Sequence, residues 1–441
     1  MLGQLPKLAA DPLAFLVKTS RDHGDVTRFR LAHLRAHLVA SPDGIRHVLQ
    51  ENSKNYNKQT PGFKVLRLIL GNGLLTSEGD FWLRQRRIAQ PAFHKEKIAK
   101  LAERMTQAAV DLAESWAAPA KDNEPINVAR EMMRVTLRIV GETLLSSDVT
   151  KNADEIGDAI SYIVEDANTR ISSILTLPLG VPTKGNRRFE KEMRTLDEVV
   201  LRTIKARRSV AKEAAPSDLL TMLMEATDEE TGEQMSDAQL RDEIMTMFLA
   251  GHETTANLLT WTFYLLSKNP AVQRELAREL HEVLGGEPAR LEHAPKLRYT
   301  KMVLNETMRL YPPAWMIARR AITDDVVGGY RIAANSIVFL SPYVTQRHPG
   351  LWDNPEGFDP ERFRSDKEGE RPRFSFFPFG GGPHLCIGNA FAMLEAQILL
   401  ATLAQKFRLD LVPGLHVVPE PLITLRPRGG MRMTVHRHPQ P

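Results

Sequence analysis

The only cysteine of the chain, Cys386, lies in a glycine-rich segment at residues 374–388, which reads FSFFPFGGGPHLCIG. A helical pattern begins just after it, and the free N–H groups of a helix N-terminus stabilise a thiolate. We expect packing alone not to explain three consecutive glycines, so we interpret residues 380–382 as allowing positive φ angles and as letting something flat and bulky approach the backbone. A phosphate loop would need Gly-Lys-Ser/Thr where Pro383 and His384 stand. Cys386 is thus a candidate metal ligand, and the alternative is a buried structural cysteine.

A second set of candidate residues, Ala-Gly-His-Glu-Thr-Thr at 250–255, lies midway along a long predicted helix. An acid and two hydroxyls in the middle of a buried helix are costly unless they have partners or a function. We interpret the missing side chain of Gly251 as room for a diatomic ligand, and threonine hydroxyls can bond back to carbonyls and bend a helix. A zinc motif H-E-x-x-H is excluded, because Ala256 stands in place of the second histidine. The alternative interpretation is a polar stripe on the surface.

Arginine, tryptophan and glutamate side chains supply the remaining candidates. Trp82 and Arg86 are i,i+4 neighbours, and an indole N–H and a guanidinium both suit carboxylate partners. Glu306 and Arg309 share one face of a predicted helix at i,i+3. The same spelling recurs elsewhere, in pairs that we expect to be exposed and to contribute little: Glu131–Arg134, Glu275–Arg278 and Glu287–Arg290.

The spacing Phe379-x-x-Gly382-x-His384-x-Cys386-x-Gly388 resembles the haem-binding loop of the cytochrome P-450 superfamily. The resemblance implies that Cys386 ligates the iron of haem b, iron protoporphyrin IX. His384 stands where the family usually has an arginine that pairs with a haem propionate. The other candidate segments follow along the chain in the order that the family shows.

The same resemblance implies roles for these segments. The residues implied to act at the haem from the long helix are Ala250, Gly251, Glu253 and Thr254. Of these, the threonine would hydrogen-bond iron-bound oxygen and the glutamate would help to relay protons. The residues implied to bind haem propionates are Trp82, Arg86 and Arg319. The residues implied to form a structural ion network behind the cysteine are Glu306, Arg309 and Arg362.

The resemblance implies a monooxygenase that uses O₂ and two electrons. Its substrate would be a lipophilic small molecule of the fatty acid, terpenoid, steroid or polyketide class, which it would hydroxylate or epoxidise. The sequence has no flavin or iron–sulfur motif, so the electrons would come from a separate donor of the ferredoxin–ferredoxin reductase or flavodoxin type. Its docking site is predicted on a basic cluster, with a solvated helix face as the alternative: Arg84, Arg86, Arg87, Lys95 and Lys97. The resemblance also implies a substrate cavity along four largely apolar stretches, although periodicity alone would place the same residues in the core: 63–75, 247–254, 313–317 and 422–424.

Two alternative functions stay open at this point. One is a peroxide-driven haem-thiolate peroxygenase of the same fold, although members that work in that way tend to lack the pair that Glu253 and Thr254 form here. The other is a non-enzymatic haem sensor or binding protein, although we find no output module in the sequence.

The elements that must position these residues are mostly helical. Residues 236–268 read as one helix of about 48 Å, because Ser236 and Gln239 spell a capping box and Asn269 precedes a proline. An amphipathic helix is predicted from residue 389. Strands are predicted at 26–40, as a hairpin, at 326–340 and at 423–438. Helices and strands do not alternate, which excludes Rossmann and barrel folds, and a loose Gly-x-Gly pattern at 71–73 lacks the third glycine and a preceding strand. The predicted fold class is mainly α with a minor β region, in a single-domain cytochrome P-450 fold.

The composition fits one globular domain over residues 1–441. The chain is 42% hydrophobic and 25% charged, without a linker, repeat or low-complexity tract. With 58 basic and 54 acidic residues, its charge is too balanced to argue for a nucleic-acid partner. The N-terminal sequence predicts neither a membrane span nor a signal peptide. One cysteine cannot form an intrachain disulfide, which agrees with a reducing compartment, so a cytoplasmic protein is predicted.

Overall fold

Residues 2–146, 153–173, 177–211, 215, 216, 218–367 and 369–438 are described by the structure, a computed structural model. The chain divides into two units. The strand-rich unit comprises Met1–Lys64, Met302–Cys386 and Pro419–Arg426, and the helical unit comprises Val65–Lys301, Ile387–Val418 and Pro427–Pro441. Most of the described residues are helical, which confirms the predicted fold class of mainly α with a minor β region.

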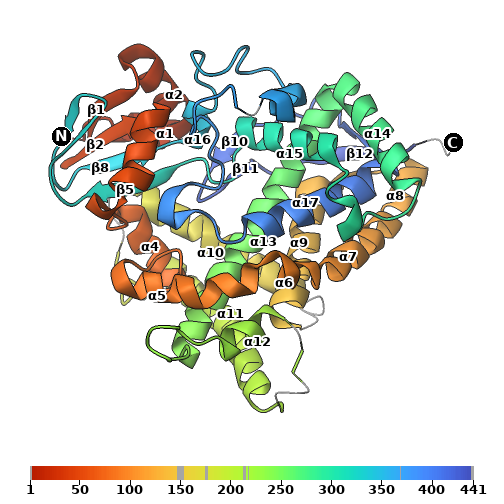
Figure 1. Cartoon of the computed structure of the whole chain (residues 1–441), viewed down its shortest axis with the longest axis horizontal. Helices are drawn as coiled ribbons and strands as arrows, with labels where there is room; N and C mark the ends of the chain where they lie inside the picture. The colour runs from red at the N-terminus through yellow and green to blue at the C-terminus, as the bar shows by residue number, and fades with distance from the viewer. Residues whose placement is uncertain are drawn as a thin grey trace. The chain divides into compact units, whose positions relative to one another are not determined.

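A five-stranded sheet organises the strand-rich unit, with the strand order β1-β2-β8-β5-β3 (Figure 1). The strands β1 (Val26–Leu31) and β2 (Leu34–Val39) pair antiparallel, which confirms the predicted hairpin. β2 runs parallel to β8 (Ile337–Leu340), and β8 runs antiparallel to β5 (Ile317–Ala321). The short strand β3 (Tyr56–Asn57) pairs with β5 and completes the sheet.

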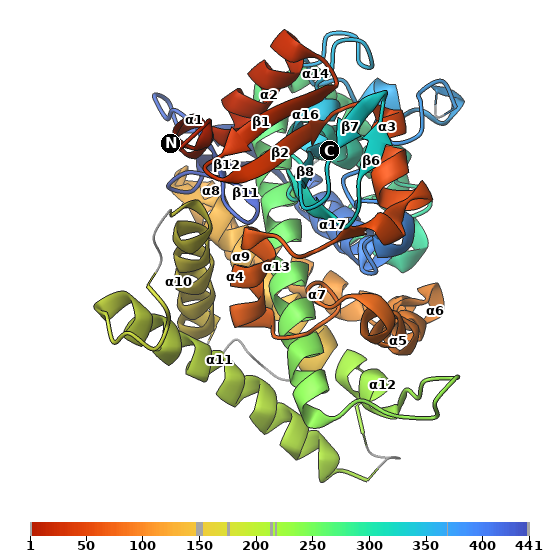
Figure 2. The same cartoon turned by 90° about the vertical axis from the view of Figure 1, so that its left-hand side faces the viewer.

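Apolar side chains cover both faces of this sheet, because successive residues of a strand point to opposite sides. On one face, Leu38 and Phe339 pack with helix α2 (Pro12–His23), which lies beside β1 in Figure 2. On the other face, Val39 and Val338 belong to a second apolar cluster. β8 is therefore buried at every position, as a central strand should be.

The other elements of the strand-rich unit are short. They are α1 (Leu5–Ala10), α3 (Pro42–Arg46), η1 (His47–Glu51), η2 (Ser53–Asn55), β6 (Asp325–Val327), β7 (Tyr330–Ile332), α16 (Pro342–Thr345), η7 (Pro360–Phe363), η8 (Ser365–Lys367), η9 (Gly382–His384) and β10 (Pro419–Pro421). Three elements contain residues of both units: α4 (Pro61–Leu70), α15 (Arg298–Leu310) and β11 (Leu425–Pro427). The strands β6, β7 and β8 confirm the strands predicted at 326–340.

The 32-residue helix α13 (Asp237–Lys268) runs through the helical unit and is drawn in light green in Figure 2. The predicted capping box forms at its start. The Ser236 side chain accepts the N–H of Gln239 at 3.3 Å, and the Gln239 side chain accepts the N–H of Ser236 at 2.8 Å. Most side chains in the middle of α13 are buried, as its predicted length required. None of the described helices, α13 included, combines the length and apolar character that a membrane crossing needs.

Further helices complete the helical unit. They are α5 (Gly79–Ala89), η3 (Gln90–Phe93), α6 (Lys95–Ala99), α7 (Ala102–Ser115), α8 (Ala117–Asp122), α9 (Val128–Leu145), α10 (Ala153–Ser172), α11 (Lys184–Arg208), α12 (Leu219–Glu225), α14 (Pro270–Leu284), η6 (Leu291–His293) and α17 (Asn389–Ala404). The helix predicted from residue 389 is α17, but its prediction as amphipathic is wrong. It is buried continuously from Leu394 to Ala404, because α7, α13 and α14 all pack against it.

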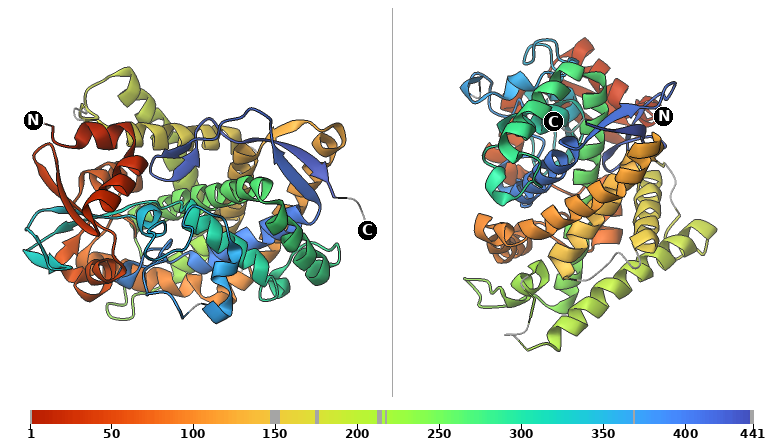
Figure 3. Two further views of the ribbon diagram at one scale, coloured as in Figure 1. Left: turned by 90° about the horizontal axis from the view of Figure 1, so that it is seen from above. Right: turned by 90° about the vertical axis from the view of Figure 1, so that its right-hand side faces the viewer.

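A three-stranded sheet near the C-terminus belongs to the same unit, and its blue strands are seen beside the C-terminal label in Figure 3. Its central strand β12 (Arg432–Arg437) pairs antiparallel with β4 (Pro125–Asn127) and β9 (Phe407–Leu411). Together with β11, β12 confirms the strands predicted at 423–438. The ring of Trp116 packs edge-on against Phe407 of β9 and Phe263 of α13, which ties this sheet to the long helix.

Glu306 and Arg309 of α15 form an ion pair that is fully buried in the strand-rich unit. The guanidinium binds both carboxylate oxygens, with Nε at 2.7 Å and Nη2 at 2.8 Å. Arg362 of η7 approaches the same carboxylate at 3.4 Å, and the N–H of Asp359 donates to it at 2.9 Å. The structure thus brings the three residues of the expected ion network together.

The same network reaches the segment that carries the cysteine. Arg309 also donates to the backbone carbonyls of Gln346, at 2.8 Å, and Gly357, at 2.8 Å. The side chain of Gln346 in turn donates to the carbonyl of Met308 and accepts the N–H of Phe377, at 3.0 Å. The Glu306 carboxylate and the Arg309 guanidinium therefore both have several hydrogen-bond partners, and through Gln346 they hold the start of the cysteine-bearing loop.

Acid should destabilise the fold through His37 of β2. This side chain is buried, and neither ring nitrogen has a hydrogen-bond partner among the described residues. Burial, helped by Arg28 and Arg35, lowers the pKa of His37 to about 4. The unfolded chain, with a pKa near the ordinary value of about 6.5, takes up a proton that the folded chain excludes. The contribution of neutral His37 to the stability of the fold is complete above about pH 6.5. It is lost as the pH falls toward 4.

We expect this residue alone to make the protein about 2 kcal/mol less stable at pH 5 than at pH 7.5. Urea unfolding at the two pH values measures the difference in unfolding free energy. His37→Met should lower this difference by about 2 kcal/mol, the part that His37 contributes. His33→Met is the matched control, because His33 is exposed in the turn between β1 and β2. An acid-induced loss that is the same in His37→Met and in the parent protein would contradict the assignment.

The Glu306 network generates a second prediction. Glu306→Ala leaves the buried Arg309 guanidinium without its counter-charge and should cost about 3–5 kcal/mol, measured by chemical unfolding. Glu275→Ala is the matched control, since the same spelling there forms an exposed ion pair with Arg278. That control should cost less than about 1 kcal/mol. Equal losses in the two variants would show that burial of the pair does not matter.

Candidate active site

Cys386 ends a loop that the structure folds tightly. Its N–H donates to the carbonyl of Phe379 at 3.0 Å, and the N–H of Leu385 donates to the carbonyl of Gly382 at 3.1 Å. The cysteine itself is exposed. A structural cysteine is normally buried, so the exposure of this thiol at the end of a braced loop favours the interpretation as a metal ligand.

The glycines of this loop have the expected positive φ angles at two positions, but packing also explains two of them. A Cβ on Gly381 would lie 2.2 Å from the ring of Phe374, and one on Gly382 would lie 1.8 Å from the carbonyl oxygen of Leu49. Gly380 and Gly382 also have positive φ angles, of 73° and 64°. The expectation that packing could not explain three glycines is therefore wrong, because the chain itself fills the space that a side chain would need.

Two candidate propionate-binding side chains, Arg319 and His384, belong to the same unit as the thiol. Arg319 of β5 is buried, and its guanidinium donates to the carbonyl of Ala318 at 3.0 Å. Its strand touches the cysteine loop, since a Cβ on Gly380 would lie 3.6 Å from Ile317. His384 lies in η9, half-buried. An exposed thiol with a buried guanidinium on the neighbouring strand fits a cofactor that carries both a metal and acidic side chains.

In the helical unit, the polar turn of α13 is mostly buried, so it is not a surface stripe. The hydroxyl of Thr254 donates to the carbonyl of Ala250 at 2.7 Å, and that of Thr255 donates to the carbonyl of Gly251 at 3.2 Å. Glu253 and Thr255 are buried, whereas Ala250 is exposed and Thr254 is partly exposed. An accessible hydroxyl next to a buried acid is thus presented on one face of a helix that is otherwise covered.

Gly251 lies where α13 meets α9. A Cβ there would lie 3.2 Å from the Cγ2 of Val140 on α9. The glycine therefore lets α9 approach α13 closely, and its interpretation as room for a diatomic ligand stays a prediction. Gly388, the last residue of the haem-loop spelling, is the N-cap of α17.

Trp82 and Arg86 lie on α5, as their spacing predicted. The indole of Trp82 is buried and Arg86 is half-buried. Between them, the buried Gln85 donates to the carboxylate of Glu243 on α13 at 3.1 Å. This bond fixes the orientation of α5 on the long helix. It thereby also sets the direction of Trp82 and Arg86, the two side chains of α5 that are candidates to bind haem propionates.

The predicted basic docking cluster is partly neutralised by the chain's own acids. Arg87 donates through Nε and Nη2 to Asp228, at 3.1 Å each, and Arg84 donates to Glu233 at 3.1 Å. An acidic turn at 228–233 therefore covers this end of α5. The two members of the cluster that stand exposed on α6 are Lys95 and Lys97.

Two of the four predicted substrate stretches meet in the strand-rich unit. The N–H of Leu425 donates to the carbonyl of Pro313 at 3.0 Å, and the indole N–H of Trp315 donates to the carbonyl of Leu422 at 2.8 Å. Residues 313–317 and 422–424 are therefore held side by side, although more than a hundred residues separate them along the chain.

In the helical unit, the Gly-x-Gly segment at 71–73 lies directly on α13. The N–H of Asn72 donates to Asp242 at 2.8 Å, the N–H of Leu74 donates to Glu243 at 3.1 Å, and a Cβ on Gly71 would overlap the Asp242 carboxylate. Two carboxylates would repel a phosphate, which agrees with the rejection of this segment as a phosphate-binding motif. The contact places the end of the stretch 63–75 on the helix that carries 247–254.

Sequence analysis missed one buried acid, Glu395 of α17. Burial raises its pKa well above the ordinary value, and the hydroxyl of Thr255 on α13 offsets only part of this. Burial therefore favours the neutral form of this acid beside the polar turn. The sequence signal that could have identified Glu395 is a single carboxylate in a helix that otherwise contains no charged residue.

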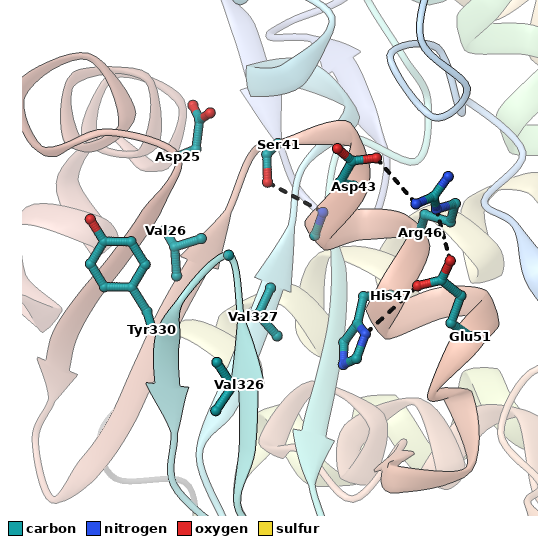
Figure 4. Close-up of a pocket in the computed structure, with 12 residues that line it drawn as sticks. Asp25, Val26, Ser41, Asp43, Arg46, His47, Glu51, Val326, Val327 and Tyr330 are labelled. Atoms are coloured by element: carbon teal, nitrogen blue, oxygen red, sulfur yellow. Dashed lines mark hydrogen bonds and ion pairs between the residues drawn. The ribbon is translucent and has the colours of Figure 1, made fainter.

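A hollow of about 540 Å³ in the strand-rich unit contains none of the predicted site residues (Figure 4). Arg46 pairs there with Asp43 and Glu51, at 3.4 and 3.0 Å, and His47 lies 2.9 Å from Asp325. Because most of its charged side chains pair with one another and none of the predicted site residues lines it, we do not assign the hollow to the site.

Comparisons with known proteins agree with this arrangement. The cytochrome P450 family matches residues 1–431. The chain is 37% identical to cyclooctatin synthase of Streptomyces melanosporofaciens, over 98% of this chain and 93% of that protein. It is 34% identical to cyclooctat-9-en-7-ol 5-monooxygenase of the same organism, over 94% and 88%.

A solved structure extends the comparison to three dimensions. The crystal structure of the heme domain of cytochrome P450DA matches with a TM-score of 0.89 at 26% identity, covering 97% of this chain and 93% of that one. The family match includes the cysteine loop, the buried Glu306 network and the polar turn of α13 in one continuous alignment. The chain therefore belongs to the cytochrome P450 family, the haem-thiolate monooxygenases.

Proposed function

We propose that this cytochrome P450 monooxygenase hydroxylates or epoxidises a cyclic terpenoid. The observation that carries the proposal is the likeness to two relatives whose names share one carbocyclic stem, cyclooctat-, one of them named as a monooxygenase of an unsaturated alcohol. The substrate stretches support an apolar ligand, since 313–317 and 422–424 contain no charged residue. A lipophilic ring system needs such surfaces more than it needs fixed charges.

In this proposal Cys386 ligates the haem iron as a thiolate. A thiolate-bound haem supplies the activation of O₂, because donation from sulfur favours cleavage of the O–O bond, a property general to cytochromes P450. Gln346 and the Glu306 network keep the loop of Cys386 in place. Donors proposed to hold the haem propionates are Arg319, His384, Trp82 and Arg86.

Proton delivery is assigned to Thr254 and Glu253. The Thr254 hydroxyl is accessible and donates to the carbonyl of Ala250, a bond that it can exchange for one to the oxygen substrate. A hydroxyl donates one hydrogen and accepts others, so it can pass on a proton that it receives. Glu253, buried beside it in the same turn, is the proposed source of that proton.

We propose an external electron donor of the ferredoxin–ferredoxin reductase or flavodoxin type. An acidic donor would meet Lys95 and Lys97 first, because Arg84 and Arg87 are already paired with the turn at 228–233. The family match includes residues of both units. This supports the proposal that residues 1–441 work as one monooxygenase domain.

The substrate class is tested by the haem spin-state shift that follows when a ligand displaces water from the iron. We expect a cyclic terpene hydrocarbon, with limonene as the first probe and larger polycyclic terpenes after it, to give the shift, and laurate, palmitate and progesterone to give none. Cys386→Ala is the control, and should show neither the shift nor the red-shifted Soret band of the reduced carbon monoxide complex. A shift with the fatty acids alone would overturn the assignment to terpenoids.

The proton assignment is tested by Thr254→Ala. With a surrogate ferredoxin, its reductase and NADPH, product formed per NADPH should fall at least tenfold, while released hydrogen peroxide rises, because general acid–base groups contribute about 10²–10⁴-fold. Haem content should stay at the parental level. Unchanged coupling would refute the role of Thr254, and turnover that is faster with added peroxide than with the reductase system would favour a peroxygenase.

A further inference from the structure

The polar turn of α13 receives a hydrogen bond from a neighbouring helix. Thr136 of α9 is fully buried, and its hydroxyl lies 3.0 Å from the carbonyl oxygen of His252. The close approach depends on Gly251, because a side chain there would press against Val140 of the same neighbouring helix. Helices α9 and α13 therefore meet at the turn that carries Glu253 and Thr254.

Three successive carbonyls of this turn each have a hydroxyl donor. Ala250 receives that of Thr254, Gly251 receives that of Thr255, and His252 receives that of Thr136. Only the last of these donors comes from outside α13. In a regular helix the carbonyl of residue 252 accepts the N–H of residue 256. A second donor on that carbonyl weakens the helical bond and tilts the carbonyl outward, which bends a helix locally.

The Thr136 hydroxyl has two competing acceptors within its own helix. It lies 2.9 Å from the carbonyl of Met132 and 3.3 Å from that of Met133, compared with 3.0 Å for the carbonyl of His252. A hydroxyl carries one hydrogen, so it can satisfy only one of these acceptors fully at a time. The bond to α13 is thus made at the expense of a bond within α9.

We infer that Thr136 is a positioning residue for the acid–alcohol turn. Its bond to His252 loosens α13 at this turn and sets the direction in which the Thr254 hydroxyl points. The catalytic consequence rests on the proposed function of Thr254, but the effect on the helix does not. Thr136 touches neither haem nor substrate in this assignment, and it acts only through the backbone of α13.

Helix α9 offers a matched control two turns further on. Thr143 is also buried, but its hydroxyl bonds within α9 alone, to the carbonyls of Ile139, at 2.6 Å, and Val140, at 3.4 Å. Thr136→Val and Thr143→Val remove the same hydroxyl from the same helix. Only the first removes a bond to α13, so their difference isolates that bond from general destabilisation.

The deciding experiment is amide hydrogen exchange of the haem-loaded protein, read on peptides that cover residues 250–258. In Thr136→Val the helical bond to the His252 carbonyl should strengthen, so exchange should slow about fivefold. Destabilisation alone would speed exchange. Thr136→Ser, which keeps a hydroxyl, should return to the parental rate, and Thr143→Val should show no slowing. Unchanged or faster exchange in Thr136→Val would overturn the inference.

A second readout separates this inference from the proposed function. With the panel compound that gives the largest spin-state shift, Thr136→Val should form less product per NADPH and release more peroxide, at unchanged haem content and substrate affinity. If Thr254→Ala leaves coupling intact but Thr136→Val still slows exchange, the proton assignment fails and the positioning of the turn stands. If coupling falls equally in Thr136→Val and Thr143→Val, Thr136 has only a structural role.

Discussion

The buried pair of Glu306 and Arg309 is the interaction on which the candidate cofactor site depends. Two charges removed from water are stable only when their remaining hydrogen-bonding groups are also satisfied. Here that demand is met by backbone carbonyls, by the N–H of Asp359 and by Arg362, so distant parts of the chain must converge on one point. Through Gln346 the convergence extends to the loop that ends in Cys386. An exposed thiol is therefore held in place by a network that is itself buried.

The same physical demand shapes the helical unit. A helix that is buried along its middle carries an acid and two hydroxyls, and each needs a partner because unpaired polar groups are costly away from water. The threonines bond to the preceding turn, and Thr136 of α9 adds a donor from outside. Glu395 avoids the cost of a buried charge in a different way, because its burial favours the neutral form of the acid. Packing and chemistry are thus coupled at this turn, because the helices that exclude water also supply its hydrogen bonds.

Some sequence-based interpretations were wrong, for different reasons. A glycine in a sequence shows that a side chain is missing, but not in which direction it would have pointed. Gly381 and Gly382 make room for the chain's own atoms. The helix α17 was predicted as amphipathic, but it is covered from several directions. Strand β5 escaped prediction because two arginines interrupt its short apolar pattern.

The sequence by itself determined the elements with strong local signals. These include α13 with its capping box, the hairpin of β1 and β2, and the cysteine loop, whose spelling identified the family because several residues at set spacings rarely coincide by chance. Only the tertiary structure decided which of four Glu-x-x-Arg pairs is buried, since desolvation depends on residues far away in the chain. It also revealed that Arg84 and Arg87 are paired with an acidic turn and that Thr136 reaches α13. Such contacts depend on how helices pack, and no local pattern of residues records that.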